Sequence, residues 1–219
     1  MIPPFDPRLD VLPAPQLRLW PELAEVPSEF VLYGGTAIAL HLGHRQSIDF
    51  DFFGDQAFDS INLVLEIPFL ANAVVTQREP NTLGCTVDRE GEIKLSFFGL
   101  PKLRRLRPPL IARDNGLRVA SLLDLAATKM SVVQMRAELK DYRDIDAIVQ
   151  DGRITLPMAL AAAEAVYGSQ FNALSTLKAL AYFDDGNVRR LPQDARARLV
   201  AAVAAVDLDR LPQIADAGP

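Results

Sequence analysis

A pair of adjacent glycines, placed directly after a short apolar run, restricts the fold of this chain more than any other feature. The run Phe30 to Tyr33 has the length and composition of a buried β-strand. Gly34 and Gly35 interrupt it, and good helix formers then continue to Leu42, where Gly43 ends the pattern. We therefore expect a strand, a glycine turn and a helix in direct succession.

The segment that follows alternates between apolar and acidic residues, which is typical of a half-buried strand. Ile48, Phe50 and Phe52 are expected on one face, and Asp49 and Asp51 on the other. Side chains two residues apart on a strand are separated by about 7 Å, so both carboxylates point the same way and can bracket metal ions. Taken alone, such a pair is more often a solvated strand face.

Three further strands are predicted from apolar runs, at residues 74–77, 83–88 and 92–98. A hairpin turn at 88–91 joins the last two. Residues 58–71 are ambiguous between helix and strand, and we favour a helix capped by Asp59 and Ser60 because a helix suits the strand before it. These elements indicate a mixed β-sheet with flanking helices.

From Ser121 onward the pattern is helical. Ser121 and Asp124 form a helix start, and this helix is predicted to reach about Arg136. Four more helices are predicted, at about residues 140–151, 156–167, 170–181 and 193–206. We expect an α/β (α+β) domain over residues 1–115, including a proline-rich N-terminal segment, and a helical domain over residues 116–219 that contributes to the same active site.

Composition excludes several classes of protein. The chain is 49% hydrophobic and 23% charged, which is close to the globular average and unlike disordered or fibrous proteins. Its net charge of -5 argues against binding nucleic acid over the whole surface, although a local basic patch remains compatible with it. No apolar run is long enough for a membrane span, and the N-terminus lacks the pattern of a signal peptide, so we expect a cytoplasmic protein. The single cysteine, Cys85, is expected to be a buried apolar residue.

Transfer of a nucleotide requires backbone amides for the phosphates, carboxylates for a divalent metal and a cation for developing charge. Gly34 and Gly35 let the backbone approach a triphosphate, and the following helix start supplies free amides and the Thr36 hydroxyl. Asp49 and Asp51 are oxygen ligands of the kind that Mg²⁺ (or Mn²⁺) prefers. Two neighbouring residues have two interpretations: Arg45 contacts phosphate or pairs with an acid, and Ser47 joins the nucleotide site or only caps the strand.

These segments resemble a known family. Residues 32–37 together with 44–53 are similar to the signature of the AbiEii/AbiGii toxin family of nucleotidyltransferase-like proteins. A second block, residues 125–130, Arg136 and 140–144, resembles the helical motif of that family, and 94–98 is also similar. The resemblance covers about residues 30–150. It implies the nucleotidyltransferase fold and, by analogy, transfer from a nucleoside triphosphate to an acceptor, tRNA or another RNA. It also implies a toxin–antitoxin system with an antitoxin encoded nearby.

Lys129 and Asp141 are further candidates in the helical block. Lys129 either aims its cation at the triphosphate or extends from an apolar helix to solvent. The strand at 92–98 offers Ser96 where many nucleotidyltransferases place a third carboxylate. Either Asp141 takes that place, or the site binds nucleotide without fast chemistry. Asp144 shares a helix face with Asp141, but a surface pair between Lys140 and Asp144 explains it equally well.

Three functions are therefore compatible with the sequence. The first is a metal-dependent nucleotidyltransferase acting on RNA, with Asp49, Asp51, Lys129 and Asp141 as catalytic residues. The second is a catalytically weak module that binds a nucleotide or a partner on the same fold. The third and most remote is an enzyme that transfers a nucleotide or phosphate to a protein side chain.

Overall fold

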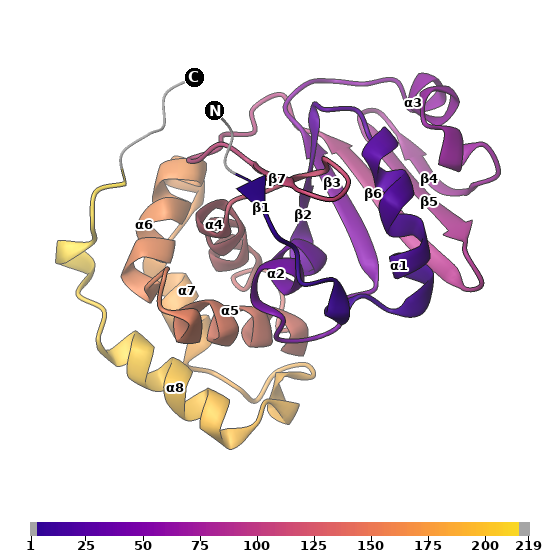
Figure 1. The fold of residues 1–219 in the computed structure, drawn as a ribbon. Coiled ribbons are helices and arrows are strands. Elements are labelled where there is room, and N and C mark those ends of the chain that lie inside the picture. The colour runs from indigo at the N-terminus through magenta and orange to yellow at the C-terminus, as the bar shows by residue number, and fades with distance from the viewer. Residues whose placement is uncertain (1–3, 215–219) are drawn as a thin grey trace. The chain divides into compact units, whose positions relative to one another are not determined.

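A computed structural model describes residues 4–214 of the 219-residue chain (Figure 1). The chain forms two compact units. The first, here called the sheet unit, consists of Met1–Arg104 and Pro108–Ala120. The second, the helical unit, consists of Arg105–Arg107 and Ser121–Pro219. Every strand of the described residues belongs to the sheet unit.

Eight strands form one mixed sheet in the order β1-β7-β8-β2-β3-β6-β5-β4. In chain order they are β1 (Pro4–Phe5), β2 (Phe30–Tyr33), β3 (Asp49–Gly54), β4 (Val74–Glu79), β5 (Thr82–Asp88), β6 (Glu92–Gly99), β7 (Leu110–Ala112) and β8 (Arg118–Val119). β3 runs parallel to β6 and antiparallel to β2. The predicted mixed sheet is confirmed, and the strand with the two aspartates lies near its centre.

The strand, glycine turn and helix predicted from the sequence are β2 and α2 (Gly34–Leu42). All four residues of β2 are buried. Both glycines lie in the first turn of α2, which therefore starts earlier than the helix formers alone suggested. Gly43 ends the helix in the left-handed conformation, with φ +67° and its N–H bonded to the Ala39 carbonyl.

The alternation predicted for β3 is confirmed within the strand and wrong at one residue before it. Buried and partly exposed residues alternate over its six positions, and Phe50 and Phe52 are fully buried. Ile48, which we expected on the same apolar face, is 64% exposed. The pairing with β6 begins at Asp49, opposite Lys94, so Ile48 precedes the strand and is not placed by the ladder.

Phenylalanine rings fill the buried face of the sheet. The Phe52 ring stacks on Phe97 at 4.9 Å between centroids, and Phe30 meets Phe97 edge-on at 5.3 Å. Burial of each such side chain contributes about 2–3 kcal/mol. The helix α1 (Ala14–Leu19) packs against β6, as Figure 1 shows, and is followed by the 3-10 helix η2 (Trp20–Glu25). This core fixes which face of β3 and β6 remains open.

The ambiguous segment after β3 is helical, as we favoured. In α3 (Ser60–Glu66) the Asp59 carboxylate caps the first turn by accepting hydrogen bonds from the amides of Ile61 and Asn62, both at 2.9 Å. A 3-10 helix, η3 (Pro68–Leu70), follows, and another, η1 (Leu9–Val11), precedes α1. The segment thus connects β3 to β4 without a strand of its own.

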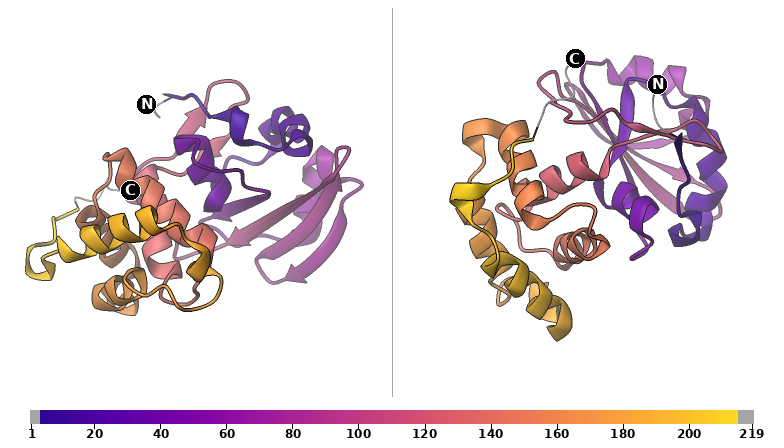
Figure 2. Two further views of the ribbon diagram at one scale, coloured as in Figure 1. Left: turned by 90° about the horizontal axis from the view of Figure 1, so that it is seen from below. Right: turned by 60° about the vertical axis from the view of Figure 1, so that its left-hand side comes forward.

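The helical unit confirms the predicted run of helices. These are α4 (Leu122–Val132), α5 (Leu139–Asp151), α6 (Leu156–Tyr167), α7 (Ala173–Leu180) and α8 (Gln193–Ala204), with the 3-10 helices η4 (Gly168–Gln170), η5 (Val188–Arg190) and η6 (Leu208–Arg210). Figure 2 shows them packed together, coloured from pink to yellow. The first ends at Val132, short of the predicted Arg136. Across residues 4–214, no helix is both long and apolar enough to cross a membrane.

The predicted helix start at Ser121 is confirmed, but its acidic residue has another partner. The Ser121 hydroxyl accepts a hydrogen bond from the Asp124 amide at 3.1 Å. The Asp124 carboxylate accepts hydrogen bonds from the amides of Leu106 at 2.7 Å and Arg107 at 3.2 Å. Burial raises the pKa of Asp124, against the lowering effect of these bonds. Asp124 thereby ties residues 105–107 to the helical unit.

Burial of Cys85 leads to a prediction about its reactivity. Burial raises the pKa of this thiol to about 11, so about one molecule in a thousand carries the thiolate at pH 8. We expect the native protein to react with Ellman's reagent at pH 8 at least about 100-fold more slowly than protein unfolded in urea, whose thiol has a pKa near 8.5. Labelling of the native protein at the unfolded rate would show that this part of β5 is open.

Candidate active site

The glycine turn is packed directly against a carboxylate. Gly34 has a φ of +72°, a conformation that residues with a side chain rarely adopt. A Cβ atom on Gly34 would lie 2.5 Å from Oδ2 of Asp51, which is closer than any real contact. Only glycine therefore allows the start of α2 and the carboxylate to approach so closely.

The second glycine makes a similar close approach to two other predicted residues. A Cβ atom on Gly35 would collide with the guanidinium of Arg45 and lie 3.2 Å from the Ser47 hydroxyl. The Arg45 side chain also donates a hydrogen bond to the Gln46 carbonyl at 2.9 Å. The structure thus brings Gly34, Gly35, Arg45, Ser47 and Asp51 together at the start of α2, and their binding of a nucleotide stays a prediction.

Thr36 joins this site to β3 through the main chain. Its side chain is buried, and its hydroxyl donates a short hydrogen bond to the main-chain carbonyl of Asp49. This bond fixes the first turn of α2 relative to the strand that carries both aspartates. A contact between Thr36 and a nucleotide remains a prediction.

Asp49 and Asp51 share the partly exposed face of β3. The Asp49 carboxylate forms no hydrogen bond or ion pair with any of residues 4–214. The register places Asp51 between Tyr33 of β2 and Ser96 of β6, and Asp49 beside Lys94. The neighbour of Asp51 on β6 is therefore the Ser96 hydroxyl and not a third carboxylate.

Two carboxylates, one of which has no partner among the described residues, fit a hard divalent cation such as Mg²⁺. This ion is commonly held by one or two protein carboxylates, and its remaining positions are filled by water and substrate phosphates. In the described part of the chain, no group of three or more histidine, cysteine, aspartate or glutamate side chains is placed to hold a metal. A metal held by these two aspartates would therefore take its remaining ligands from water and from the substrate.

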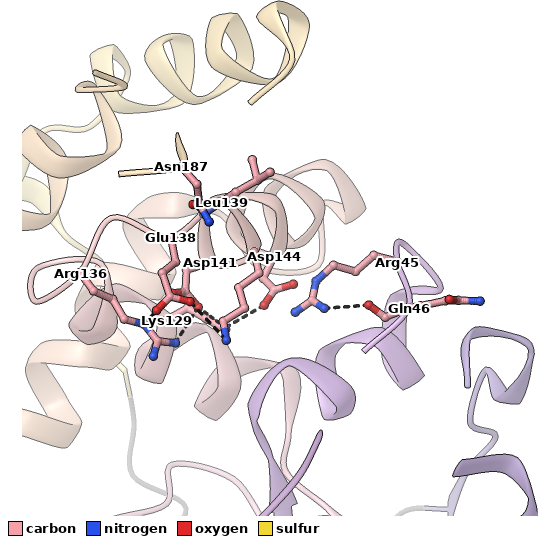
Figure 3. A network of polar contacts seen from close by, with 10 residues as sticks. Arg45, Gln46, Lys129, Arg136, Glu138, Leu139, Asp141, Asp144 and Asn187 are labelled. Atoms are coloured by element: carbon pink, nitrogen blue, oxygen red, sulfur yellow. Dashed lines mark hydrogen bonds and ion pairs between the residues drawn. The ribbon is translucent and has the colours of Figure 1, made fainter. Parts of the chain in front are cut away.

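The predicted residues of the helical unit form a buried charge cluster (Figure 3). Lys129 on α4 is 6% exposed, and its ammonium lies 2.6 Å from a carboxylate oxygen of Asp141 and 2.7 Å from one of Asp144, both on α5. Arg136 Nε donates to the other oxygen of Asp141 at 2.9 Å. Both oxygens of Asp141 thus bind cations within the unit, and its proposed part in a metal site remains a prediction.

Asp144 belongs to the buried cluster, which the sequence did not predict, and the alternative of a surface pair with Lys140 is wrong. Asp144 is fully buried, whereas Lys140 is exposed and lies 3.2 Å from Glu138. A buried lysine on an apolar helix needs an acidic partner. The shared helix face of Asp141 and Asp144 was therefore the signal in the sequence that both pair with Lys129. Lys129 is accordingly not a side chain that extends to solvent.

The close approach at the glycine turn predicts a large loss of stability on substitution. Gly34→Ala should lower the free energy of unfolding by about 2–4 kcal/mol. The new methyl group would sit on a residue with a positive φ, which is strained, and would also collide with Asp51. Gly116→Ala is the matched control, because Gly116 has φ +77° and open space around its Cβ position, and should cost only about 1 kcal/mol. Urea denaturation measures both. Equal losses would show that the contact with Asp51 is unimportant.

The buried cluster predicts a second large effect. Asp141→Asn removes the negative charge shared by Lys129 and Arg136 and should lower the free energy of unfolding by about 3 kcal/mol. Lys140→Ala, which removes only an exposed ion pair, should change it by less than about 1 kcal/mol. If Asp141→Asn unfolds at the same urea concentration as the unmodified protein, the cluster does not stabilise the helical unit.

Comparisons with known proteins point to one family. The family model described as "Nucleotidyl transferase AbiEii toxin, Type IV TA system" matches residues 22–217. An uncharacterised protein from Aquifex aeolicus (strain VF5) is 33% identical over 120 residues, which are 54% of this chain and 56% of that protein. The chain thus spans little more than half the length of this curated relative.

Two solved structures share the fold at low identity. One is a candidate nucleotidyltransferase from H. pylori, with 16% identity, a TM-score of 0.50 and coverage of 85% of this chain and 90% of that one. The other is MenT4, a nucleotidyltransferase toxin from Mycobacterium tuberculosis H37Rv, with 14% identity, a TM-score of 0.55 and coverage of 87% and 83%. They show that this chain has a nucleotidyltransferase fold.

Proposed function

The chain belongs to the AbiEii nucleotidyl transferase toxin family, and we propose that it moves a nucleotide from a metal-bound nucleoside triphosphate to an RNA acceptor. One observation carries the proposal. The glycine turn at the start of α2 is packed against Asp51, on the same strand face as the Asp49 carboxylate, which has no protein partner among the described residues. Amides for phosphate and oxygen ligands for a cation therefore adjoin one another.

Each residue of the sheet unit has a role in this proposal. The amides of Gly34, Gly35 and Thr36 and the side chains of Arg45 and Ser47 bind the triphosphate, because a helix start and a guanidinium both favour phosphate oxygens. Asp49 and Asp51 hold Mg²⁺ or Mn²⁺, which when bound neutralises phosphate charge and orients the reacting oxygens. In the transfer, the acceptor hydroxyl loses its proton to the solvent, and its oxygen forms a bond to the α-phosphorus. The bond from that phosphorus to the bridging oxygen breaks, and pyrophosphate leaves.

The family supports a partner, and the proposed substrates support a location. A toxin of a toxin–antitoxin system implies an antitoxin, and we propose that it is encoded nearby. RNA and nucleoside triphosphates are both abundant in the cytoplasm, which is where we propose that the protein acts. The catalytic roles predicted for Lys129 and Asp141 are proposals of the same kind, and their burial in one charge cluster requires that any loss of activity be compared with loss of stability.

A second candidate function follows from the residue beside Asp51. Because Ser96 occupies that position on β6, and the described residues offer no third ligand there, the same site is also suited to bind a nucleotide without transferring it. A binding module would be stabilised against heat by triphosphate and magnesium but would form no product. The two candidates therefore differ in a single assay.

Transfer is tested with purified protein, magnesium, each labelled triphosphate in turn and total RNA. We expect labelled RNA, and we expect Asp49→Asn and Asp51→Asn each to reduce its rate about 100-fold or more, because each removes a ligand of the cation that stabilises the transition state. Chelation with EDTA should have the same effect.

Asp88→Asn is the matched control, because Asp88 is an exposed aspartate at the end of β5 in the same sheet. Its rate should stay within about twofold of the unmodified protein. Stabilisation by triphosphate without labelled RNA would support the binding module instead. Equal labelling by an Asp49→Asn/Asp51→Asn double variant would show that the site is elsewhere.

A further inference from the structure

The strands beside the two aspartates have faces of opposite character. On β5 and β6 the side chains on one face are almost completely buried: Leu83, Cys85, Val87, Ile93, Leu95 and Phe97. The other residues share the face of Asp49 and Asp51, and on β6 these are Glu92, Lys94, Ser96 and Phe98. Their side chains are partly or fully exposed. The open face therefore extends from the aspartates onto β6.

The β6 residues on this face form a row in register with β3. Lys94 is opposite Asp49, Ser96 is opposite Asp51, and Phe98 is opposite Phe53. Neighbouring strands are about 4.8 Å apart, so each member of the row adjoins its partner on β3. The position next to Asp51 thus has a cation on one side and an aromatic ring on the other.

Lys94 is a cation that is not paired with any side chain among the described residues. Its side chain is exposed, and it forms no ion pair or hydrogen bond with another side chain in the described part of the chain. A lysine with this freedom beside a carboxylate face contributes little to stability, since exposed pairs are worth less than about 1 kcal/mol. It is therefore available for an anionic ligand.

Phe98 belongs to an aromatic group at the other end of the row. Its ring meets Phe53 edge-on at 5.4 Å, and Phe53 stacks on the buried Tyr33 at 4.8 Å with 13° between the ring planes. These contacts hold the rings in place, and Phe98 and Phe53 nevertheless remain partly exposed. Exposed aromatic rings on an open sheet face are a common platform for the bases of single-stranded nucleic acids.

We propose that the row Lys94, Ser96 and Phe98 binds the end of the RNA acceptor, with a backbone phosphate on Lys94 and a base against Phe98. This inference rests on the proposed function and names the residues that select its acceptor. A polyanionic strand end combines a phosphate and a base at short spacing, which matches the cation and the ring on either side of Ser96. Ser96 lies between these two residues of the row and adds no charge of its own.

The test separates binding of the acceptor from binding of the triphosphate. In the transfer assay, Lys94→Ala should raise the KM for RNA about 10-fold and leave the KM for the triphosphate within twofold. It should also reduce the slope of log kcat/KM against log salt by about 0.7, because one phosphate contact is lost. Lys94→Arg should restore both values.

The aromatic contact is tested on the same row. Phe98→Leu keeps an apolar side chain of similar size but cannot stack, and should raise the KM for RNA about 10-fold, whereas Phe98→Tyr should not. Arg78→Ala is the matched control, because Arg78 is an exposed cation of the same sheet whose register with Leu83 directs it to the other face. Its KM for RNA should be unchanged. An unchanged KM for RNA in both Lys94→Ala and Phe98→Leu would overturn the inference while leaving the proposed function intact.

Failure of the proposed function is recognised separately. If the unmodified protein labels no RNA, transfer to RNA is refuted, and fluorescence anisotropy with a labelled single-stranded RNA of about ten nucleotides then decides the inference. Lys94→Ala and Phe98→Leu must each weaken binding about 10-fold relative to Arg78→Ala. Equal affinities of the three variants, or the absence of any binding by the unmodified protein, would overturn it.

Discussion

The close approach of Gly34 to Asp51 is the contact on which the rest of the candidate site depends, because any side chain at position 34 would collide with that carboxylate. The left-handed conformation of Gly34 turns the chain sharply from β2 into α2, so that the free amides of the first helical turn adjoin the face of β3 that carries both aspartates. Gly35 makes the equivalent approach to Arg45 and Ser47. The site is therefore held by backbone geometry and by the hydrogen bond from Thr36 to the Asp49 carbonyl.

Asp49 of the sheet unit and the pair Asp141 and Asp144 of the helical unit lie in opposite environments. In the helical unit, Asp141 and Asp144 are removed from water and bonded to the buried ammonium of Lys129, because a buried charge without a partner would be costly. In the sheet unit, Asp49 remains partly exposed and has no partner among the described residues. A partly exposed carboxylate such as Asp49 can exchange water for a cation. The carboxylates of Asp141 and Asp144, which are paired with lysine or arginine, stabilise the fold.

The open face of β6 places a cation next to the two aspartates. Lys94 is opposite Asp49 and the neutral Ser96 is opposite Asp51, while the exposed Glu92 lies on the same face beyond Lys94. For a chain with a net charge of -5, a cation at this place matters because a polyanionic substrate is repelled by the protein as a whole.

The sequence by itself determined the local units of this protein. The glycines after Phe30–Tyr33, the alternation of Phe50 and Phe52 with aspartates, and the helix start at Ser121 were each predicted and found, because each depends on backbone preferences and hydrophobic periodicity over a few residues. The resemblance of two segments to a toxin family identified the fold for the same reason, since those motifs are local.

Only the tertiary structure decided which local units meet. The parallel pairing of β3 with β6 places Lys94 and Ser96 beside the aspartates, and the start of that ladder leaves Ile48 exposed, although the alternation suggested burial. The packing of α4 on α5 buries Asp144 against Lys129, where helical spacing allowed a surface pair with Lys140 equally well. A periodic pattern specifies which side chains share a face. The register of a strand and the partner of a helix depend on contacts between residues distant in the sequence, and a local pattern does not contain these contacts.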